Sequence, residues 1–169
     1  MSNEFTKLQT ACCSGYRPEK LPWGYDESDA RCRELKRRLF HIVEALYHSG
    51  RRRFICGMAR GVDTYFCEAA LTLRDIHADV YVEAAIPCRT QANGWSAEQR
   101  ARYFALLARC DAETYISHEY TRDCMMRRNR YMVDSSSVIV TVFDGHHGGT
   151  MATRNYAVRQ GLDVIELMP

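Results

Sequence analysis

The sequence predicts an α/β protein with a mostly parallel sheet of about six strands and helices on both faces. Short strand-like segments alternate with segments of helical periodicity five times, and a final strand closes the pattern. This alternation is typical of parallel sheets, in which crossover helices join successive strands. Residues 138–143 (VIVTVF) are nearly all apolar, as expected of a strand that is covered on both faces.

Six short apolar segments are the expected strands. They span residues 8–14, 53–56, 79–86, 113–117, 138–143 and 163–167. The third of them ends at Pro87, which cannot donate to a sheet hydrogen bond. A turn-rich segment, GYRPEKLPWGYDES, separates the first strand from the first helix.

Five segments between these strands have helical periodicity. They span residues 29–49, 64–76, 96–110, 122–135 and 150–160. In the first, apolar side chains recur at intervals of three and four: Leu35, Leu39, Ile42, Val43 and Leu46. Gly50 ends that helix as a C′ glycine. Ser96, with Gln99 three residues later, forms a capping box that begins the third helix.

Composition excludes several classes of protein. The chain has 169 residues, 46% hydrophobic and 26% charged, which predicts one soluble globular domain spanning residues 1–169. A net charge of +2 does not indicate binding to nucleic acid or to a membrane surface. The longest apolar run is far shorter than the roughly 20 residues of a membrane helix. The N-terminus, MSNEFTKLQT, lacks the features of a secretory signal, so we expect a cytoplasmic protein.

The eight cysteines do not have the spacing of a zinc site or of a disulfide framework. Cys12 and Cys13 are adjacent, the others are scattered singly, and no CxxC pair occurs. We expect free thiols, several of them in the core. His146 and His147, even with His118, lack a clear third ligand, so no metal site is expected.

Ligands of a parallel α/β sheet bind at the carboxyl ends of the strands, where loops lead into helices. The loops at that edge are SGYRP, GMARGVD, the turn at Pro87, HEYTRD and DGHHGGT. In DGHHGGT, Asp144 ends a buried strand, Gly148 and Gly149 allow close approach of a ligand, and Thr150 opens a helix. Unpaired helix N–H groups there favour a phosphate or a carboxylate. The same residues also suit an ordinary strand-to-helix turn with Thr150 as its cap.

The loop GMARGVD has the same organisation, with Gly57 and Gly61 between a strand and a helix. It is neither a Walker A loop nor a GxGxxG dinucleotide motif. Arg60 can meet a phosphate or remain solvated, and Asp63 is placed to cap the helix.

The loop SGYRP follows the first strand. Arg17, beside Gly15, can offer a fork of donors to an anion, and Tyr16 can stack on a base. A surface arginine and a turn tyrosine are the alternative interpretation.

Asn129 lies on an apolar face of the helix over residues 122–135, among two methionines and a valine. An amide there costs roughly 1–3 kcal/mol unless it is hydrogen-bonded, so it either ties the helix to a loop or faces the ligand. Arg128 and Arg130 flank it, and at least one of them is expected to be solvated. Asp134 is a further carboxylate that can tie a loop.

In this order, SGYRP, CGMARGVD and RRNRYMVDSSSVIVTVFDGHHGGT resemble the YpsA-like family of the SLOG (LOG/DprA-related) superfamily, from residue 12 to about 167. The resemblance implies a Rossmann-like domain that binds a nucleotide-derived ligand, similar to NAD or ADP-ribose, as a sensor or regulator. It implies no required cofactor, and by superfamily analogy a homo-oligomer. The ligand-binding residues that it implies are Gly15, Arg17, Gly57, Arg60, Gly61, Asp63, Arg128, Asn129, Asp134, Asp144, Gly148, Gly149, Thr150 and Thr153.

One departure from related proteins bears on catalysis. LOG-type phosphoribohydrolases carry PGGxGTxxE, and the similar stretch here is HHGGTMAT, with Thr153 at the glutamate position. A hydroxyl cannot act as a carboxylate base near pH 7. Either this activity is lost, which we favour, or another acid replaces the glutamate, with Asp63, Glu68 and Asp144 as the nearby candidates.

Three functions are therefore compared. The first is a nucleotide-binding sensor or regulator. The second is a nucleosidase or phosphoribohydrolase that cleaves an N-glycosidic bond, with an arginine on the phosphate and Asp63 or Asp144 at the reacting sugar. The third, a DprA-like binder of single-stranded nucleic acid, needs a basic groove with aromatic residues. The candidate basic residues are the arginines at 51–53 and those at 127, 128 and 130 with Tyr131. The first group precedes a strand and is expected at the opposite edge of the sheet from the cleft, so this function is disfavoured.

Overall fold

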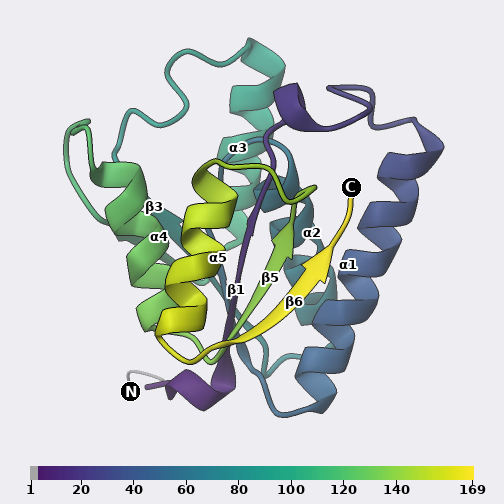
Figure 1. Cartoon of the computed structure of the whole chain (residues 1–169), viewed down its shortest axis with the longest axis vertical. Helices are drawn as coiled ribbons and strands as arrows, with labels where there is room; N and C mark the ends of the chain where they lie inside the picture. Colours follow the sequence, from purple (N-terminus) through teal and green to yellow (C-terminus); the bar gives the residue numbers. More distant parts are fainter. Residues whose placement is uncertain (1–3) are drawn as a thin grey trace.

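The computed structural model describes residues 4–169, which contain a six-stranded sheet and five α-helices (Figure 1). The first three residues of the predicted 1–169 domain, and with them the start of the N-terminal segment, lie outside the described residues. The strands are β1 (Thr10–Gly15), β2 (Arg53–Cys56), β3 (Tyr81–Ile86), β4 (Ala112–Tyr115), β5 (Val138–Val142) and β6 (Asp163–Leu167). The helices are α1 (Ala30–His48), α2 (Val62–Ile76), α3 (Ala97–Arg109), α4 (Cys124–Asp134) and α5 (Gly149–Arg159), with short 3-10 turns η1 (Lys7–Gln9) and η2 (Pro18–Lys20).

The strands are ordered β4-β3-β2-β1-β5-β6, and every neighbouring pair is parallel. The predicted fold class, a Rossmann-like α/β sheet, is therefore confirmed. The direction of strand succession reverses between β1 and β5, which lie side by side near the middle of the sheet. Loops that leave the carboxyl ends of two such strands diverge and leave a crevice for a ligand.

Each face of the sheet has its own apolar cluster. Helices α1, α2 and α3 cover one face, and α4 and α5 cover the other, where Figure 1 shows them in front of the strands. Alternate residues of one strand enter different clusters: Cys13 packs on the first face, and Cys12 packs on the second. Coverage of both faces explains why β5 is buried along its whole length.

The largest differences from the sequence-based boundaries lie at the edges of elements. The first strand begins at Thr10 because Leu8 belongs to η1 and is 76% exposed. Helix α2 begins at Val62, two residues before the predicted start, because Gly61 at φ +85° turns the chain directly into the helix. Helix α5 begins at Gly149 after Gly148, so Thr150 lies within the first turn and is not its cap.

The cysteines and the arginines before β2 lie where the sequence places them. All eight cysteines are free thiols, and all but Cys110 are buried. Arg52 pairs with Asp79 at 2.8 Å, and Arg53 donates to Glu83 at 2.7 Å, both at the amino-terminal edge of the sheet. Within residues 4–169, no helix has the length and apolar character needed to cross a membrane.

Candidate functional site

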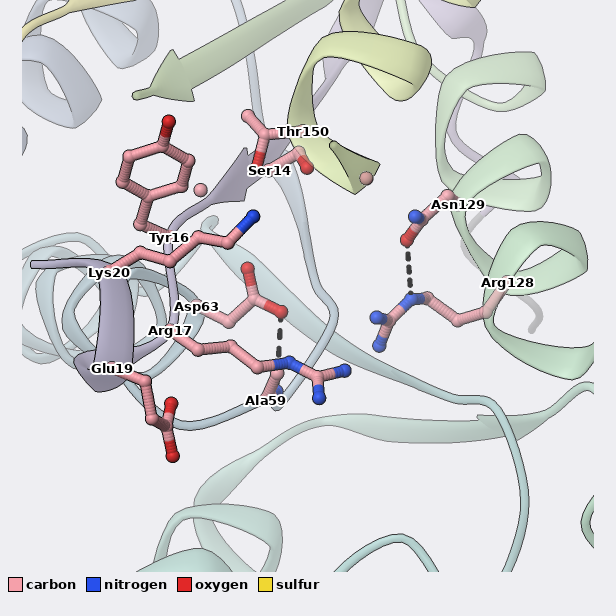
Figure 2. Close-up of a pocket in the computed structure, with 12 residues that line it drawn as sticks. Ser14, Tyr16, Arg17, Glu19, Lys20, Ala59, Asp63, Arg128, Asn129 and Thr150 are labelled. Carbon is pink, nitrogen blue, oxygen red and sulfur yellow. Dashed lines mark hydrogen bonds between the residues drawn. The ribbon is translucent and has the colours of Figure 1, made fainter. Parts of the chain in front are cut away.

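The carboxyl edge of the sheet contains a cavity of about 410 Å³ where the loops after β1 and β2 meet the first turn of α5 (Figure 2). Its volume is in the range of small-molecule sites. The residues that line it are Ser14, Gly15, Tyr16, Arg17, Glu19, Lys20, Ala59, Asp63, Arg128, Asn129, Gly149 and Thr150.

Two glycines bring the start of α2 against the end of β1. A Cβ on Gly15 would lie 2.4 Å from Cγ1 of Val62, so only glycine allows this close packing. Gly61 has φ +85°, and a Cβ on it would lie 2.6 Å from the carbonyl oxygen of Tyr16. That carbonyl accepts a hydrogen bond from the Val62 N–H at 3.1 Å. The packing places Asp63, in the first turn of α2, beside the loop that carries Arg17.

Arg128 is a buried cation in the cavity wall, only 4% exposed. Its Nη1 donates to the carbonyl oxygens of Gly57 and Ala85, and its Nε donates to Oδ1 of Asn129 at 2.8 Å. Burial lowers the pKa of Arg128, while the charge of Asp63 opposes that shift. Arg128 therefore anchors α4 to the loop after β2 and also presents positive charge to the cavity.

Asp63 is a buried carboxylate, 6% exposed, in the same wall. One carboxylate oxygen accepts a hydrogen bond from the Ala59 N–H at 3.2 Å, as Figure 2 shows. Burial raises the pKa of Asp63, and the positive charge of Arg128 partly offsets the rise. Burial therefore favours the protonated form of Asp63 more than it is favoured in a solvated aspartate.

The amide of Asn129, which lies on an apolar face of α4, is hydrogen-bonded on both its nitrogen and its oxygen. Its Nδ2 donates to Oγ1 of Thr153 at 3.0 Å, and its Oδ1 accepts from Arg128. The Thr153 hydroxyl in turn donates to the carbonyl oxygen of Gly149 at 2.9 Å. The chain of hydrogen bonds connects α4 with the first turn of α5, and Asn129 also lines the cavity.

Positive charge and unpaired donors dominate the opposite side of the cavity. The side chains of Arg17 and Lys20 are exposed and make no hydrogen bond or ion pair within residues 4–169. Lys20 Nζ lies 5.4 Å from the centre of the Tyr16 ring and 3.0 Å from the position of a Cβ on Gly148. Gly148 supplies no side-chain cap, so the first N–H groups of α5 stay available. An anion is the group that these donors and cations suit.

Fourteen residues are predicted to bind ligand, and the structure brings most of them to one place. Seven line the cavity: Gly15, Arg17, Asp63, Arg128, Asn129, Gly149 and Thr150. Four contact that lining from behind: Gly57, Gly61, Gly148 and Thr153. Of the remaining three, Arg60 and Asp144 also contact lining residues, Glu19 and Tyr16, whereas Asp134 lies away from the cavity.

Each of those three has a partner of its own. Arg60 points towards Tyr25, whose hydroxyl lies 2.9 Å from Nη1. Asp134 ends α4 at the opposite edge of the sheet and accepts from the Tyr156 hydroxyl at 2.8 Å. Asp144 is not itself a lining residue, but it accepts a hydrogen bond from the hydroxyl of Tyr16, which lines the cavity.

The three carboxylates considered as replacements for a catalytic glutamate differ in the same way. Hydrogen bonds from Tyr16 and His146 lower the pKa of Asp144 to about 2, so it stays ionised. Glu68 is paired with Arg102 at 2.8 Å. Of the three, Asp63 alone lines the cavity.

Lys20 and Glu19 line the cavity but were not predicted to belong to the site. Both lie in or beside η2, a 3-10 turn that begins with Pro18 and returns the chain over the cavity. The signal was present in the sequence, because Pro18 after Arg17 favours a tight turn that brings the following residues back beside the loop.

Comparison with known proteins identifies the family. The YpsA family model, described as "YspA SLOG family", matches residues 11–162. The chain belongs to this family. It is 31% identical to the uncharacterized SPbeta prophage-derived protein YoqJ of Bacillus subtilis over 137 residues, 73% of this chain and 80% of YoqJ. It is 21% identical to the UPF0398 protein YpsA of the same organism over 145 residues, 85% of this chain and 80% of that protein.

The fold is shared with a solved structure, the DNA processing protein A (DprA) of Streptococcus pneumoniae. The TM-score is 0.62 at 15% identity, with 93% of this chain and 49% of DprA covered. The chain thus spans about half the length of DprA. At this identity, the similarity to DprA shows that the two proteins share a fold and shows nothing about function.

Proposed function

We propose that this YpsA-family protein binds a nucleotide or a nucleotide-derived ligand at the cavity, with the ligand's phosphate beside the first turn of α5. The convergence of Arg17, Lys20 and Arg128 on that turn carries the proposal. Within residues 4–169, the side chains of Arg17 and Lys20 make no hydrogen bond or ion pair, so their charges are free to pair with a bound anion. A role as sensor or regulator follows if binding is not accompanied by turnover.

The electrostatic balance of the cavity supports an anionic ligand. Its lining holds three cationic side chains and two carboxylates, Glu19 and Asp63. Glu19 already pairs with Arg60 at 3.2 Å, which leaves a positive excess towards the ligand. Arg17 also offers the planar fork of donors that matches phosphate oxygens.

One observation favours a second function, cleavage of an N-glycosidic bond. Asp63 is a buried carboxyl with a raised pKa in the wall of the cavity, as an acid or base at the scissile bond would need to be. Thr153, at the position of the LOG-type glutamate, is hydrogen-bonded to Asn129 and supplies no carboxylate. If the protein is an enzyme of this kind, Asp63→Asn abolishes release of the base.

A thermal-shift panel tests ligand binding. AMP, ADP, ADP-ribose, NAD and ribose 5-phosphate are each added at about 1 mM, and free base is assayed in the same samples. A ligand at 100 times its Kd stabilises the native state by about 2.7 kcal/mol. At roughly 2–4 °C per kcal/mol, the melting temperature then rises by more than about 5 °C.

Two arginine variants make the assay specific to the cavity. Arg17→Ala removes an unpartnered cation from the lining and should abolish the shift. Arg159→Ala makes the same change in charge at the far end of α5 and should preserve it. Flat melting curves across the panel, or an equal loss in both variants, would reject the proposal.

A further inference from the structure

A second, smaller cavity of about 50 Å³ lies beside the first and has aromatic walls. Tyr25, Trp95 and Tyr103 line it together with Arg60. A third recess of similar volume joins the two cavities. It shares Arg17 and Ala59 with the first cavity, and it shares Arg60 and Trp95 with the second.

The rings of the second cavity are held in place. The guanidinium carbon of Arg60 lies 5.3 Å from the centre of the Trp95 ring and 5.8 Å from that of Tyr25. Trp95 also packs edge-on against the buried ring of Tyr103, with the ring centres 5.3 Å apart. Tyr25 nevertheless remains 52% exposed, and Trp95 is only partly buried. Arg60 covers part of both rings, and the exposure of Tyr25 and Trp95 leaves further ring surface on which a planar ligand can stack.

The first cavity offers no comparable ring. Tyr16 is its aromatic lining residue, but it is 5% exposed, and Lys20 lies over its face. Phe143 packs edge-on against the same ring. The first cavity therefore offers cations and N–H donors that suit a phosphate. The aromatic rings on which a base can stack lie on the other side of Arg17, in the second cavity.

We infer that the base of the ligand binds at an aromatic subsite formed by Trp95 and Tyr25, while the phosphate occupies the first cavity and Arg17 lies between the two. The inference rests on the proposed function. It specifies the class of ligand: a nucleoside phosphate, with ADP as the probe, in which the base contributes to affinity, and not a sugar phosphate alone. In this arrangement Arg60 lies beside the base, because its guanidinium group is close to the rings of both Trp95 and Tyr25.

Tryptophan fluorescence tests the inference directly. Of the two tryptophans, Trp23 is buried and donates to the Tyr65 hydroxyl at 3.4 Å, while Trp95 faces the second cavity. We expect ADP to quench the emission of the wild-type protein and of Trp23→Phe, because the base stacks on Trp95. Trp95→Phe should lose the quenching but retain an affinity for ADP close to that of the wild type, since a ring remains.

Calorimetry with two probes separates the base from the phosphate. Because Trp95 supplies a stacking surface for the base, Trp95→Ala should weaken ADP binding by roughly 5- to 150-fold. Ribose 5-phosphate, which has no base, should bind both proteins equally. Phe104→Ala, which removes a 54% exposed ring of α3 that does not line the subsite, is the matched control and should leave both affinities unchanged.

The outcomes distinguish this inference from the proposed function. If both probes bind through Arg17 and Trp95→Ala leaves the affinity for ADP unchanged, the base lies elsewhere and the aromatic subsite is wrong. An equal loss of both probes in Trp95→Ala would also overturn it, because the effect would not depend on the base. If neither probe binds the wild-type protein, the proposed function itself fails.

Discussion

Asp63 and Arg128 approach Gly57 together. Oδ2 of Asp63 and Nη1 of Arg128 each lie 2.7 Å from the point that a Cβ on this residue would occupy. The same arginine nitrogen donates to the carbonyl oxygen of Gly57. Glycine at this position thus lets two buried, oppositely charged groups share the end of β2, where the loop enters the cavity.

Gly57→Ala should therefore destabilise the protein and weaken ligand binding. The methyl group would displace Asp63 or Arg128, and such overpacking costs about 1–3 kcal/mol of unfolding free energy. Urea denaturation measures the loss. Gly94→Ala is the control, because a Cβ there meets nothing within 4 Å, and it should stay within about 0.5 kcal/mol of the wild type. Equal stability of the two variants would contradict the proposed role of Gly57.

Substitution of Arg128 should reduce both stability and ligand affinity, whereas substitution of Arg17 should reduce ligand affinity only. Arg128→Ala leaves the buried carbonyls of Gly57 and Ala85 without this donor and should cost about 2–4 kcal/mol as well as ligand affinity. Arg128→Lys should recover little, because an ammonium cannot reproduce the fork of donors. Arg17→Ala should lose affinity at an unchanged melting temperature. Denaturation combined with calorimetry decides, and a large loss of stability in Arg17→Ala would refute the distinction.

The raised pKa of Asp63 predicts that anion binding depends on pH. Sulfate remains divalent between about pH 4 and pH 8, and of the two carboxyls in the lining the pKa of Asp63 is raised while that of Glu19 is lowered, so Asp63 is the carboxyl expected to change its charge in this range. Sulfate affinity should rise as pH falls towards the pKa of Asp63. Asp63→Asn should bind sulfate roughly tenfold more tightly at pH 7, with little pH dependence, because a repulsion of about 1.4 kcal/mol is removed.

The raised pKa of Asp63 also makes the stability of the native state depend on pH. Because burial raises the pKa of Asp63, the native state holds this proton more firmly than the unfolded chain. The stabilisation is complete below the unfolded pKa and is lost as pH rises through the folded pKa. Asp163→Asn, at the opposite edge of the sheet, is the control for the sulfate titration and should behave as the wild type. The same sulfate affinity for Asp63→Asn and the wild type at pH 7 would disprove the prediction.

The fold followed from the sequence because its signals are local. Helical periodicity places Leu35 and Leu39 on one face of α1, and both are buried. The apolar run of β5 is buried along its whole length. In both cases, the pattern of burial can be read from residues that are close together in the sequence. The errors lie at the ends of elements, for example at Leu8, which belongs to a 3-10 turn and not to the first strand, and at Gly61, where a positive φ begins the helix without a polar cap. The strand order was not predicted, because several orders of six parallel strands are compatible with right-handed crossovers.

The site was less accessible to the same reasoning because side-chain direction is set by tertiary contacts. Arg60 lies in the glycine loop, yet Tyr25 and Trp95, far away in sequence, turn it towards the second cavity. Lys20 reaches the start of α5 through a 3-10 turn that no periodicity marks. A loop motif identifies the neighbourhood of a ligand, whereas the partners of each side chain decide which residues reach it.

The hydrogen bond from Tyr16 to Asp144 should control the titration of that carboxyl. The Tyr16 hydroxyl is the largest cause of the depressed pKa of Asp144, which is about 2, and His146 is the next. Tyr16→Phe should therefore raise the pKa of Asp144 towards its usual value, as measured by ¹³C NMR of the carboxyl carbon. A depressed pKa stabilises the native state above the unfolded pKa, and this contribution is lost as pH falls from about 4 to about 2. Acid denaturation of Tyr16→Phe should accordingly be less steep in that range. Tyr47→Phe, which removes the 3.0 Å hydrogen bond to Asp79 at the other edge of the sheet, should leave Asp144 unchanged. A pKa near 2 that persists in Tyr16→Phe would assign the depression to His146 instead.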